Sequence, residues 1–547
     1  MQRSKSPAWT AALIAALFLS GCLASCAGSP APAPESVAAP TAVAAAPAPE
    51  SAAPAAALPA AAGTAPLPLP PLPPAPPMET STQQVRLDAL ESRFASGGVG
   101  AFARDNSASF TSFTLSNGIP VVVRKNDANR VRSVSLVLRG GSLIVEPSRA
   151  GLEGVMLRTM ARGSSSWPYG KLAAKLDETS SSISAESAFE YSTYTLTTID
   201  RYFNEMLPIW AGTLTNPSWG STDFDRVLSD SKLALKKKAQ DPWQTAALTM
   251  NKVFFEGHPY AATTDGTSES LASLDLAAVK AHYERTWSAN RLFVVAVGNY
   301  EVPELKSALE GVFGAIVNRD FPVPVGVATF QGRVRPGLVK QVFPASKGVA
   351  YLRADFAAPA PTDQDWPATS LSMRVLSDLL FNVVRDKYGA VYTPGSYIRA
   401  FSANYGSLTV FKTDVPGKVK GYLDEAVGEL AAGKAMSVAP GPDEGKSPRM
   451  SLEAVLPTYK ALYINETYQK IGTNAAVAGE IARSVMQAGD PRAWLLDVAR
   501  VSATSADDVE RATKKWLLEA PATWVLLGPE EMIMPVDDAA FMGWGGK

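Results

Sequence analysis

The chain has 547 residues, of which 51 are basic and 52 acidic, and 46% are hydrophobic. This balance lacks the basic face that nucleic-acid recognition requires, so nucleic acid is not an expected partner. Two cysteines and two histidines exclude a disulfide framework and a thiolate metal cluster, while the apolar content suffices for two packed domains.

The first residues are typical of a bacterial export signal. Two basic residues precede an apolar run, 9–19, that is too short to span a bilayer as a mature helix. We therefore interpret residues 1–21 as a lipoprotein signal peptide. Leu19-Ser20-Gly21-Cys22 has the form of a lipobox, which would make Cys22 the lipidated N-terminus.

Two alternatives to lipidation at Cys22 remain open. Cys26 ends a second, overlapping lipobox, and an ordinary cleaved secretory signal would leave no lipid at all. The residue after Cys22 is Leu23 and not Asp. By resemblance to sorted lipoproteins, this indicates the outer membrane. The expected location is the bacterial cell envelope, with the chain anchored by lipid and facing the periplasm.

Residues 22–106 are interpreted as the lipidated N-terminus and a linker. From Ala27 to about Pro77 the chain is almost entirely Ala and Pro, a composition that cannot bury enough surface to fold. At ~3.1 Å per residue its upper reach is on the order of 150 Å. We expect a spacer between the membrane and the globular part.

Residues 107–317 are predicted to form a first α+β domain. Asn117-Gly118 in the segment 113–125 indicates a hairpin with a type I′ turn. Alternation and apolar periodicity predict strands at 134–138, 183–186, 190–199 and 291–297, and helices at 151–163, 201–214, 223–238, 243–255 and 276–286. Strands interrupted by groups of helices indicate helices packed on a sheet.

The helix predicted at 151–163 has a stripe of large apolar residues at core-facing spacing, made of Leu152, Val155, Met156 and Met160 and widened by Leu157. We expect this helix to pack against the sheet of the first domain.

Residues 337–530 repeat the plan. Strands are expected at 349–356, 405–415 and 522–529, and helices at 367–387, 418–431, 452–466 and 473–487. The last strand mirrors 292–299, which indicates an internal duplication. Residues 318–336 are the predicted interdomain linker, 436–450 a surface insertion and 531–547 a C-terminal tail.

The order of these segments resembles the M16 family of pitrilysin-like zinc peptidases over about residues 107–530. The segments "FTLSNGIPVVVRK" (113–125), "GHPYAATTDGT" (257–267) and "HYERTWSANRLFVVAVGNY" (282–300) resemble the family's first hairpin, His-Pro-Tyr loop and helix-to-strand passage. The resemblance implies two tandem homologous domains of the LuxS/metallopeptidase-like type, each a sheet packed with helices, which together form half of a clamshell.

In active members the helix at 151–163 carries His-x-x-Glu-His, whose two imidazoles and carboxylate share one face. The resemblance places Gly154, Leu157 and Arg158 at these positions, and it places the third ligand near 234–236, where no acid stands. It therefore implies that this chain binds no metal. His258 and His282 are expected in structural or solvent-facing roles, and a serine hydrolase is disfavoured because no G-x-S-x-G elbow occurs.

In the second domain, "VVRDKYGAVYTPGSY" (383–397) resembles the family's Arg-x6-Tyr segment, with Arg385 and Tyr392 seven residues apart. The resemblance implies that this pair hydrogen-bonds the scissile carbonyl of a peptide, where a guanidinium and a phenol would stabilise an oxyanion. The alternative is an ordinary helix end with Lys387 in its last turn, Gly389 after it and Tyr392 packed on the next strand.

These features favour a catalytically incomplete M16 subunit that pairs with a zinc-bearing sister and contributes Arg385 and Tyr392 to peptide binding. Zinc is expected only in the sister, and peptide or unfolded polypeptide is the expected substrate. The chain departs from the family's processing-peptidase α-type subunit in having a proline-rich segment, 354–373, in place of a glycine-rich loop before the Arg-Tyr helix. The rival hypothesis is a non-enzymatic envelope scaffold or peptide-binding protein, and an autonomous zinc peptidase is a third.

Overall fold

The computed structural model describes residues 109–324, 327–439 and 447–544. Cys22, Cys26 and the Ala/Pro linker lie outside the described residues, so the predictions made for them stay predictions. The described residues all belong to one compact unit. In these ranges no helix combines the length and apolar character that a membrane crossing requires.

The first half of the chain forms a mixed sheet in which β2 and β6 are parallel and the other neighbours antiparallel. In the described residues its order is β1 (Phe110–Thr114), β2 (Pro120–Lys125), β6 (Leu292–Gly298), β3 (Val131–Arg139), β5 (Tyr191–Ile199) and β4 (Ser182–Ser187). β3 and β6, rich in Val and Leu, lie at its centre and are almost entirely buried.

The β1–β2 hairpin is present, but its turn is not the predicted type I′. Gly118 has φ +89°, whereas Asn117 is not among the non-glycine residues with positive φ, which a type I′ turn would need at both positions. The Asn117 side chain instead donates to the carbonyls of Phe313 and Ile316 at 2.8 and 3.0 Å. This contact with a distant helix end overrides the local turn preference.

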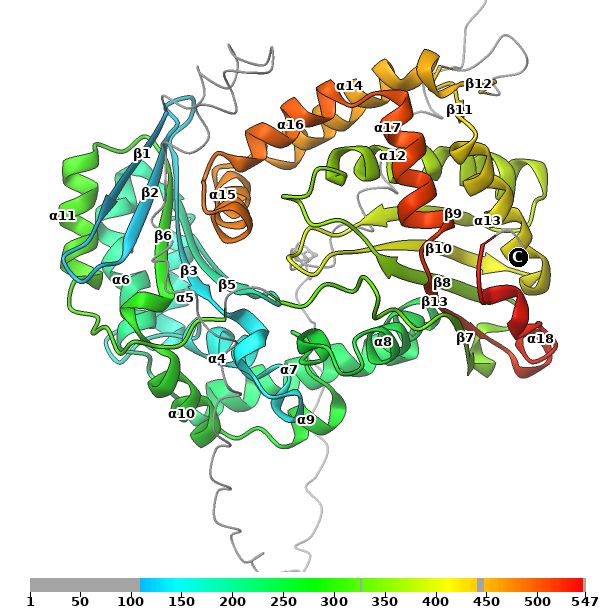
Figure 1. Ribbon diagram of the computed structural model, residues 1–547. Coiled ribbons are helices and arrows are strands. Elements are labelled where there is room, and N and C mark those ends of the chain that lie inside the picture. Colours follow the sequence, from blue (N-terminus) through cyan, green and yellow to red (C-terminus); the bar gives the residue numbers. More distant parts are fainter. Residues whose placement is uncertain (1–108, 325–326, 440–446, 545–547) are drawn as a thin grey trace, which may run out of the picture. The chain divides into compact units, whose positions relative to one another are not determined.

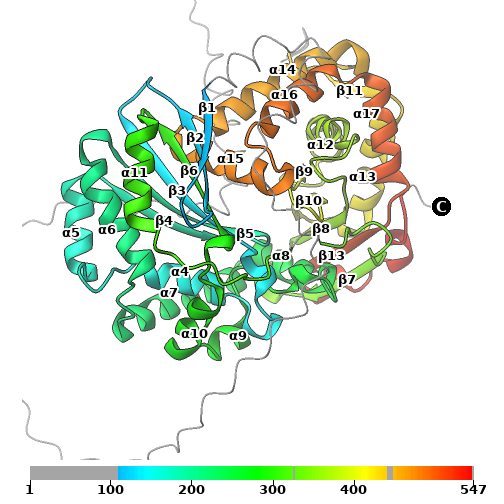
Figure 2. The same ribbon diagram turned by 60° about the vertical axis from the view of Figure 1, so that its left-hand side comes forward.

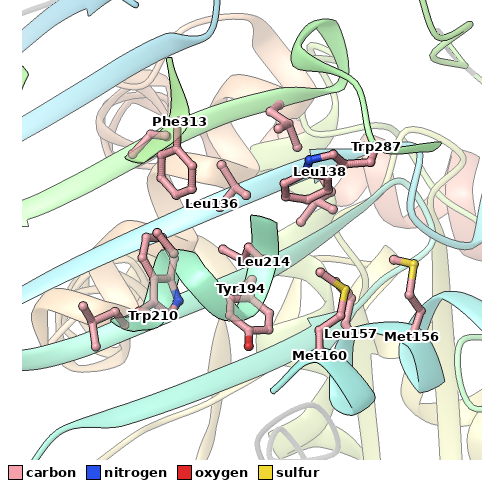
Figure 3. Close-up of a cluster of buried hydrophobic side chains, with 14 of the residues drawn as sticks. Leu136, Leu138, Met156, Leu157, Met160, Tyr194, Trp210, Leu214, Trp287 and Phe313 are labelled. Carbon is pink, nitrogen blue, oxygen red and sulfur yellow. The ribbon is translucent and has the colours of Figure 1, made fainter. Parts of the chain in front are cut away.

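The helices of the first half are α4 (Leu152–Met160), α5 (Tyr169–Glu178), α6 (Phe203–Thr215), α7 (Ser221–Gln240), α8 (Pro242–Phe254), α9 (Ser268–Ala272), α10 (Leu276–Thr286) and α11 (Val302–Phe313). The apolar stripe predicted on α4 lies in the core of this half. Figure 3 shows Met156, Leu157 and Met160 of α4 pointing toward the side chains of the sheet.

The second half forms a second mixed sheet, with the order β7 (Gly337–Val342), β13 (Ala522–Gly528), β8 (Ala350–Ala357), β10 (Tyr405–Thr413) and β9 (Thr393–Ile398) within the described residues. The longer helices are α12 (Trp366–Leu380), α13 (Pro416–Ala431), α14 (Leu452–Lys470), α15 (Asn474–Ala488), α16 (Ala493–Ala503) and α17 (Ala506–Thr513), and α18 (Glu530–Ile533) is short. A small pair, β11 (Lys434–Met436) and β12 (Arg449–Ser451), stands apart.

The two sheets repeat one topology. In each, a parallel pair (β2 with β6, β7 with β13) is followed by antiparallel partners in the same order. β3, β5 and β4 thus correspond to β8, β10 and β9, and α4 corresponds to α12. The fold prediction of two α+β domains, each a sheet packed with helices, is confirmed.

Each half lends a helix to the other half's sheet. Val477, Ile481 and Val485 of α15 pack with Val137 and Phe293 on the first sheet. In the other direction, Ala246 and Met250 of α8 share a cluster with Val525 and Leu527 of the second sheet. Figures 1 and 2 show α15 beside β3 and α8 beside β13.

Candidate functional site

The helix α4 has its large side chains turned into the protein. Leu157, which the resemblance places at the position of the general base, is fully buried with Met156 and Met160. The same cluster contains Leu136 of β3 and Tyr194 of β5 (Figure 3). Leu157 therefore contributes to the core and has no access to a substrate.

Arg158 and Gly154 face a different neighbour, the helix α7. The Nη2 atom of Arg158 donates to the Oγ atom of Ser231 at 3.1 Å. The guanidinium folds back over Gly154, so that a Cβ atom at that residue would lie 3.2 Å from Nη1. Glycine leaves the space that the guanidinium uses.

This arrangement does not fit a divalent metal. At the two positions where the resemblance expects metal ligands, Gly154 has only a hydrogen and Arg158 a cation, and the nearby side chain on α7 is the hydroxyl of Ser231. At the third-ligand position expected near 234–236, Leu235 belongs to the core and its two neighbours are exposed. In the described part of the chain no group of three His, Cys, Asp or Glu side chains could hold a metal ion.

Sequence reasoning missed a buried charged group on the other side of α4. Glu153 accepts hydrogen bonds from His282 Nε2 at 2.7 Å and from Arg291 at 2.5 Å. His282 Nδ1 accepts a hydrogen bond from the Nη2 atom of Arg285 at 3.1 Å. Because a guanidinium can only donate, the proton of the neutral imidazole is on Nε2. These contacts hold α4 to α10 and to the start of β6.

The Arg291 guanidinium keeps the Glu153 carboxyl ionised. Burial alone would raise the pKa of Glu153, but Arg291 and His282 outweigh it and lower that pKa to about 2. Burial lowers the pKa of His282, so the imidazole stays neutral at pH 7. The histidine therefore has a structural role, and solvent exposure is excluded for it.

The His-Pro-Tyr loop joins the two halves. His258 contacts the Ala328 carbonyl through Nε2 at 2.7 Å and accepts from the Tyr260 N–H through Nδ1. The Tyr260 hydroxyl donates to Glu190 at 2.6 Å, and the same carboxylate accepts the N–H of Ser402 from the second half. This loop is structural, as the sequence led us to expect for His258.

Arg385 and Tyr392 come together at the surface. The Arg385 guanidinium carbon lies 4.5 Å from the ring centroid of Phe381 and 5.6 Å from that of Tyr392. Tyr392 is 58% exposed and Phe381 39%. Among the described residues, Arg385 has no carboxylate partner in an ion pair.

The alternative interpretation of this segment was a helix end with Tyr392 packed on the next strand. The helix end is present, but the tyrosine is not packed. Gly389 has φ +60°, and the segment ends there. Tyr392, however, is largely exposed instead of packed on the next strand. Lys387 and Tyr388 bind Glu425 of α13 at 2.7 and 2.8 Å, so the following turn is fixed while the Arg385 side chain stays available.

The segment that carries Arg385 is a π-helix, Phe381–Lys387, which continues α12. Such helices are rare, and single turns of them occur frequently at functional sites. The Phe381 and Arg385 side chains, four residues apart, meet on the exposed side of this helix.

The edge strand β4 of the first sheet is open. The pairing of Ala188 with Tyr191 sets the alternation along β4 and β5, so the N–H and C=O groups of Ile183, Ala185 and Ser187 point away from β5. Within the described residues these groups have no hydrogen-bond partner. α4 contacts this strand and also contacts α7.

The corresponding edge strand β9 of the second sheet is closed at two of its three outward positions. Pro394 has no N–H to offer. At Ser396 the outward N–H and C=O both contact the hydroxyl of Ser377 on α12, at 3.2 and 3.0 Å.

Family comparisons agree with this geometry. Residues 121–267 match a family model described as insulinase, peptidase family M16, and residues 273–434 match the model of the peptidase M16 inactive domain. Together the two matches cover more than half of the chain.

A curated relative from Helicobacter pylori, described as the non-peptidase homolog YmxG, is 23% identical over 186 residues. That match spans 34% of this chain and 43% of the relative, so the chain covers less than half of its length.

Two solved structures share the fold. A protease from Helicobacter pylori aligns with a TM-score of 0.66 at 15% identity, over 77% of this chain and 99% of that one. A peptidase M16 inactive domain from Pseudomonas fluorescens aligns with a TM-score of 0.64 at 17% identity, over 77% and 98%.

Proposed function

The chain belongs to peptidase family M16 as a non-catalytic member, and we propose that it serves as the substrate-handling subunit of a two-chain peptidase. A zinc-bearing sister supplies the metal and the general base. This chain supplies the Arg385 and Tyr392 side chains, which bind the carbonyl of a peptide at the sister's metal.

The exposed Arg385 carries this proposal. A guanidinium held between two aromatic rings, without a carboxylate of its own in the described part of the chain, is a preorganised donor for an oxygen that gains negative charge. The loss of two metal ligands, at Gly154 and Arg158, and of the general base, at Leu157, explains why such a donor would act in a partner's site.

The open edge of β4 supports a second element of the proposal, which is peptide binding by this chain itself. An extended peptide can add to an unpaired strand edge through main-chain hydrogen bonds alone. Ile183, Ala185 and Ser187 offer three consecutive outward N–H and C=O pairs for this.

The test is peptide cleavage by the purified complex of both chains. With Arg385→Ala we expect kcat/KM to fall by about 100-fold, the loss typical of removing one oxyanion donor. Lys387→Ala is the matched control, because this exposed cation lies two residues away and binds Glu425. An unchanged kcat/KM for Arg385→Ala would contradict the composite site.

The rival function is a peptide-binding or scaffolding protein of the envelope without any peptidase partner, a role that the non-peptidase description of one relative favours. Purification from native membranes distinguishes the two. A stoichiometric zinc-bearing M16 chain supports the peptidase subunit, and its absence supports the rival.

The membrane anchor belongs to the same proposal. A lipid at Cys22 would hold the chain at the outer membrane, facing the periplasm. Cys22→Ala should move the protein from the membrane fraction to the soluble fraction, while Cys26→Ala should not.

A further inference from the structure

Arg158 is a partly buried cation without a contacting carboxylate. One of its five N–H donors is used by the Ser231 hydroxyl, and no other hydrogen bond of the guanidinium occurs within the described residues. A neutral hydroxyl satisfies one donor but does not balance the charge. Burial of a guanidinium is unfavourable unless an anion compensates it.

Two other buried arginines show what compensation looks like in this protein. Arg291 contacts Glu153 at 2.5 Å, and Arg353 makes a two-pronged contact with Asp355 at 2.8 and 2.8 Å. Both carboxylates are fully buried with their arginines. Arg158 differs because it is partly exposed and could take its anion from outside the chain.

The charge of Arg158 is only partly balanced by its surroundings. The acid that acts on it electrostatically is Asp265, which forms no ion pair with Arg158 and binds Lys238 at 2.6 Å. Arg158 and Lys238 therefore share one carboxylate. A second carboxylate would neutralise the group.

The position of α4 indicates where that carboxylate comes from. α4 contacts both the open edge strand β4 and α7, which carries Ser231. A peptide paired with Ile183 and Ala185 would run beside α4. A carboxylate on such a peptide could then reach the guanidinium.

We propose that Arg158 binds the carboxylate of an extended peptide whose main chain pairs with β4, so that this chain selects peptides by that charge. The free donors of the guanidinium match the two oxygens of a carboxylate. Ser231 orients the guanidinium, and Gly154 leaves room for it. The inference rests on the peptide binding in the proposed function.

The test measures binding of unlabelled random decapeptides to the purified full-length chain by titration calorimetry. Three pools separate the sources of the carboxylate: free C-termini without Asp or Glu, amidated C-termini without Asp or Glu, and amidated C-termini with one internal Asp or Glu. We expect at least tenfold tighter binding for one or both carboxylate-bearing pools than for the amidated acid-free pool. The preferred pool identifies a terminal or side-chain carboxylate.

Arg158→Gln should abolish that preference and leave binding of the acid-free amidated pool unchanged. Ser231→Ala, which keeps the charge and loses the orienting hydroxyl, should reduce the preference two- to fivefold. Arg162→Gln is the matched control. Arg162 lies four residues after Arg158, and its charge is already paired with Asp223. Thermal unfolding of each variant verifies the fold.

Equal binding of all pools, or a preference that persists in Arg158→Gln, would overturn the inference. The outcome is independent of the composite site. A preference that depends on Arg158 stands even if Arg385→Ala leaves peptide cleavage unchanged, and its absence leaves the role of Arg385 intact.

Discussion

In both halves of the molecule a helix lies beside an edge strand, but the outward main-chain groups of that strand are bonded in one half and unpaired in the other, among the described residues. In the second half α12 closes β9, since the Ser377 hydroxyl contacts both outward groups of Ser396 and Pro394 has no N–H. In the first half α4 contacts β4, whose outward groups at Ile183, Ala185 and Ser187 have no partner among the described residues.

The two helices are also held differently. α12 is tied to its strand, because Ser396 Oγ donates to the Met373 carbonyl in addition to the Ser377 contacts. α4 is held from its buried side, where Glu153 binds Arg291 and His282. A duplicated fold can thus keep the same topology while one copy closes its edge and the other leaves it free to bind.

The largest expected effect concerns the group that holds α4. Glu153→Ala leaves Arg291 buried without its carboxylate, and we expect a loss of about 3–5 kcal/mol in the free energy of unfolding. Urea denaturation measures it. Glu178→Ala, which removes a surface pair with Lys175, should cost less than about 1 kcal/mol. Similar losses in both variants would mean that α4 is not held by its buried charges.

The same group predicts a dependence on acid. The folded-state pKa of Glu153 is lowered from 4.5 to about 2, so its contribution is complete above about pH 4.5 and lost as the pH falls toward 2. This amounts to roughly 3 kcal/mol. Unfolding free energies of the wild type should therefore fall more steeply below pH 4.5 than those of Glu153→Gln. Parallel curves would show that another carboxylate dominates.

Closing the open edge should abolish peptide binding. Ala185→Pro places a proline at an outward position of β4, as Pro394 stands in β9. It removes an outward N–H that has no partner among the described residues. We expect at least a tenfold rise in Kd for the decapeptide pools, with the unfolding temperature nearly unchanged. Ala185→Ser keeps the N–H and should bind normally. Equal binding by the proline variant would place the peptide elsewhere.

Opening the closed edge should have the smallest effect. Ser377→Ala combined with Pro394→Val frees the outward groups of β9 and restores the missing N–H. We expect a second, weaker peptide site, seen as a rise in binding stoichiometry in calorimetry. Unchanged stoichiometry would indicate that an open edge alone is insufficient and that α4 is needed as well.

Much of the fold could be predicted because its strands and helices carry their own periodicity. β6 and β13 are nearly continuous apolar runs, and the stripe on α4 has core-facing spacing. α5 was missed although Tyr169, Leu172, Ala173 and Leu176 have helical spacing, because the helix has only 10 residues and buries Leu172 alone.

The candidate site was predictable where its residues are close in sequence. Arg385 lies in the π-helix and Tyr392 directly before β9, and their side chains meet in the structure. Glu153 finds His282 and Arg291 at sequence separations of 129 and 138 residues, and no local pattern indicates such a contact. Whether β4 or β9 is open depends on strand order and on a hydroxyl from another element.

The exchange of α8 and α15 between the halves has a consequence for how the molecule holds together. In each half, one face of the sheet is covered by a helix from the other half. Separating the two halves would therefore expose two apolar surfaces at once. The halves are therefore one cooperative folding unit. A chain cut once between 318 and 336 would remain a single particle, held by mutual coverage and not by the connecting peptide.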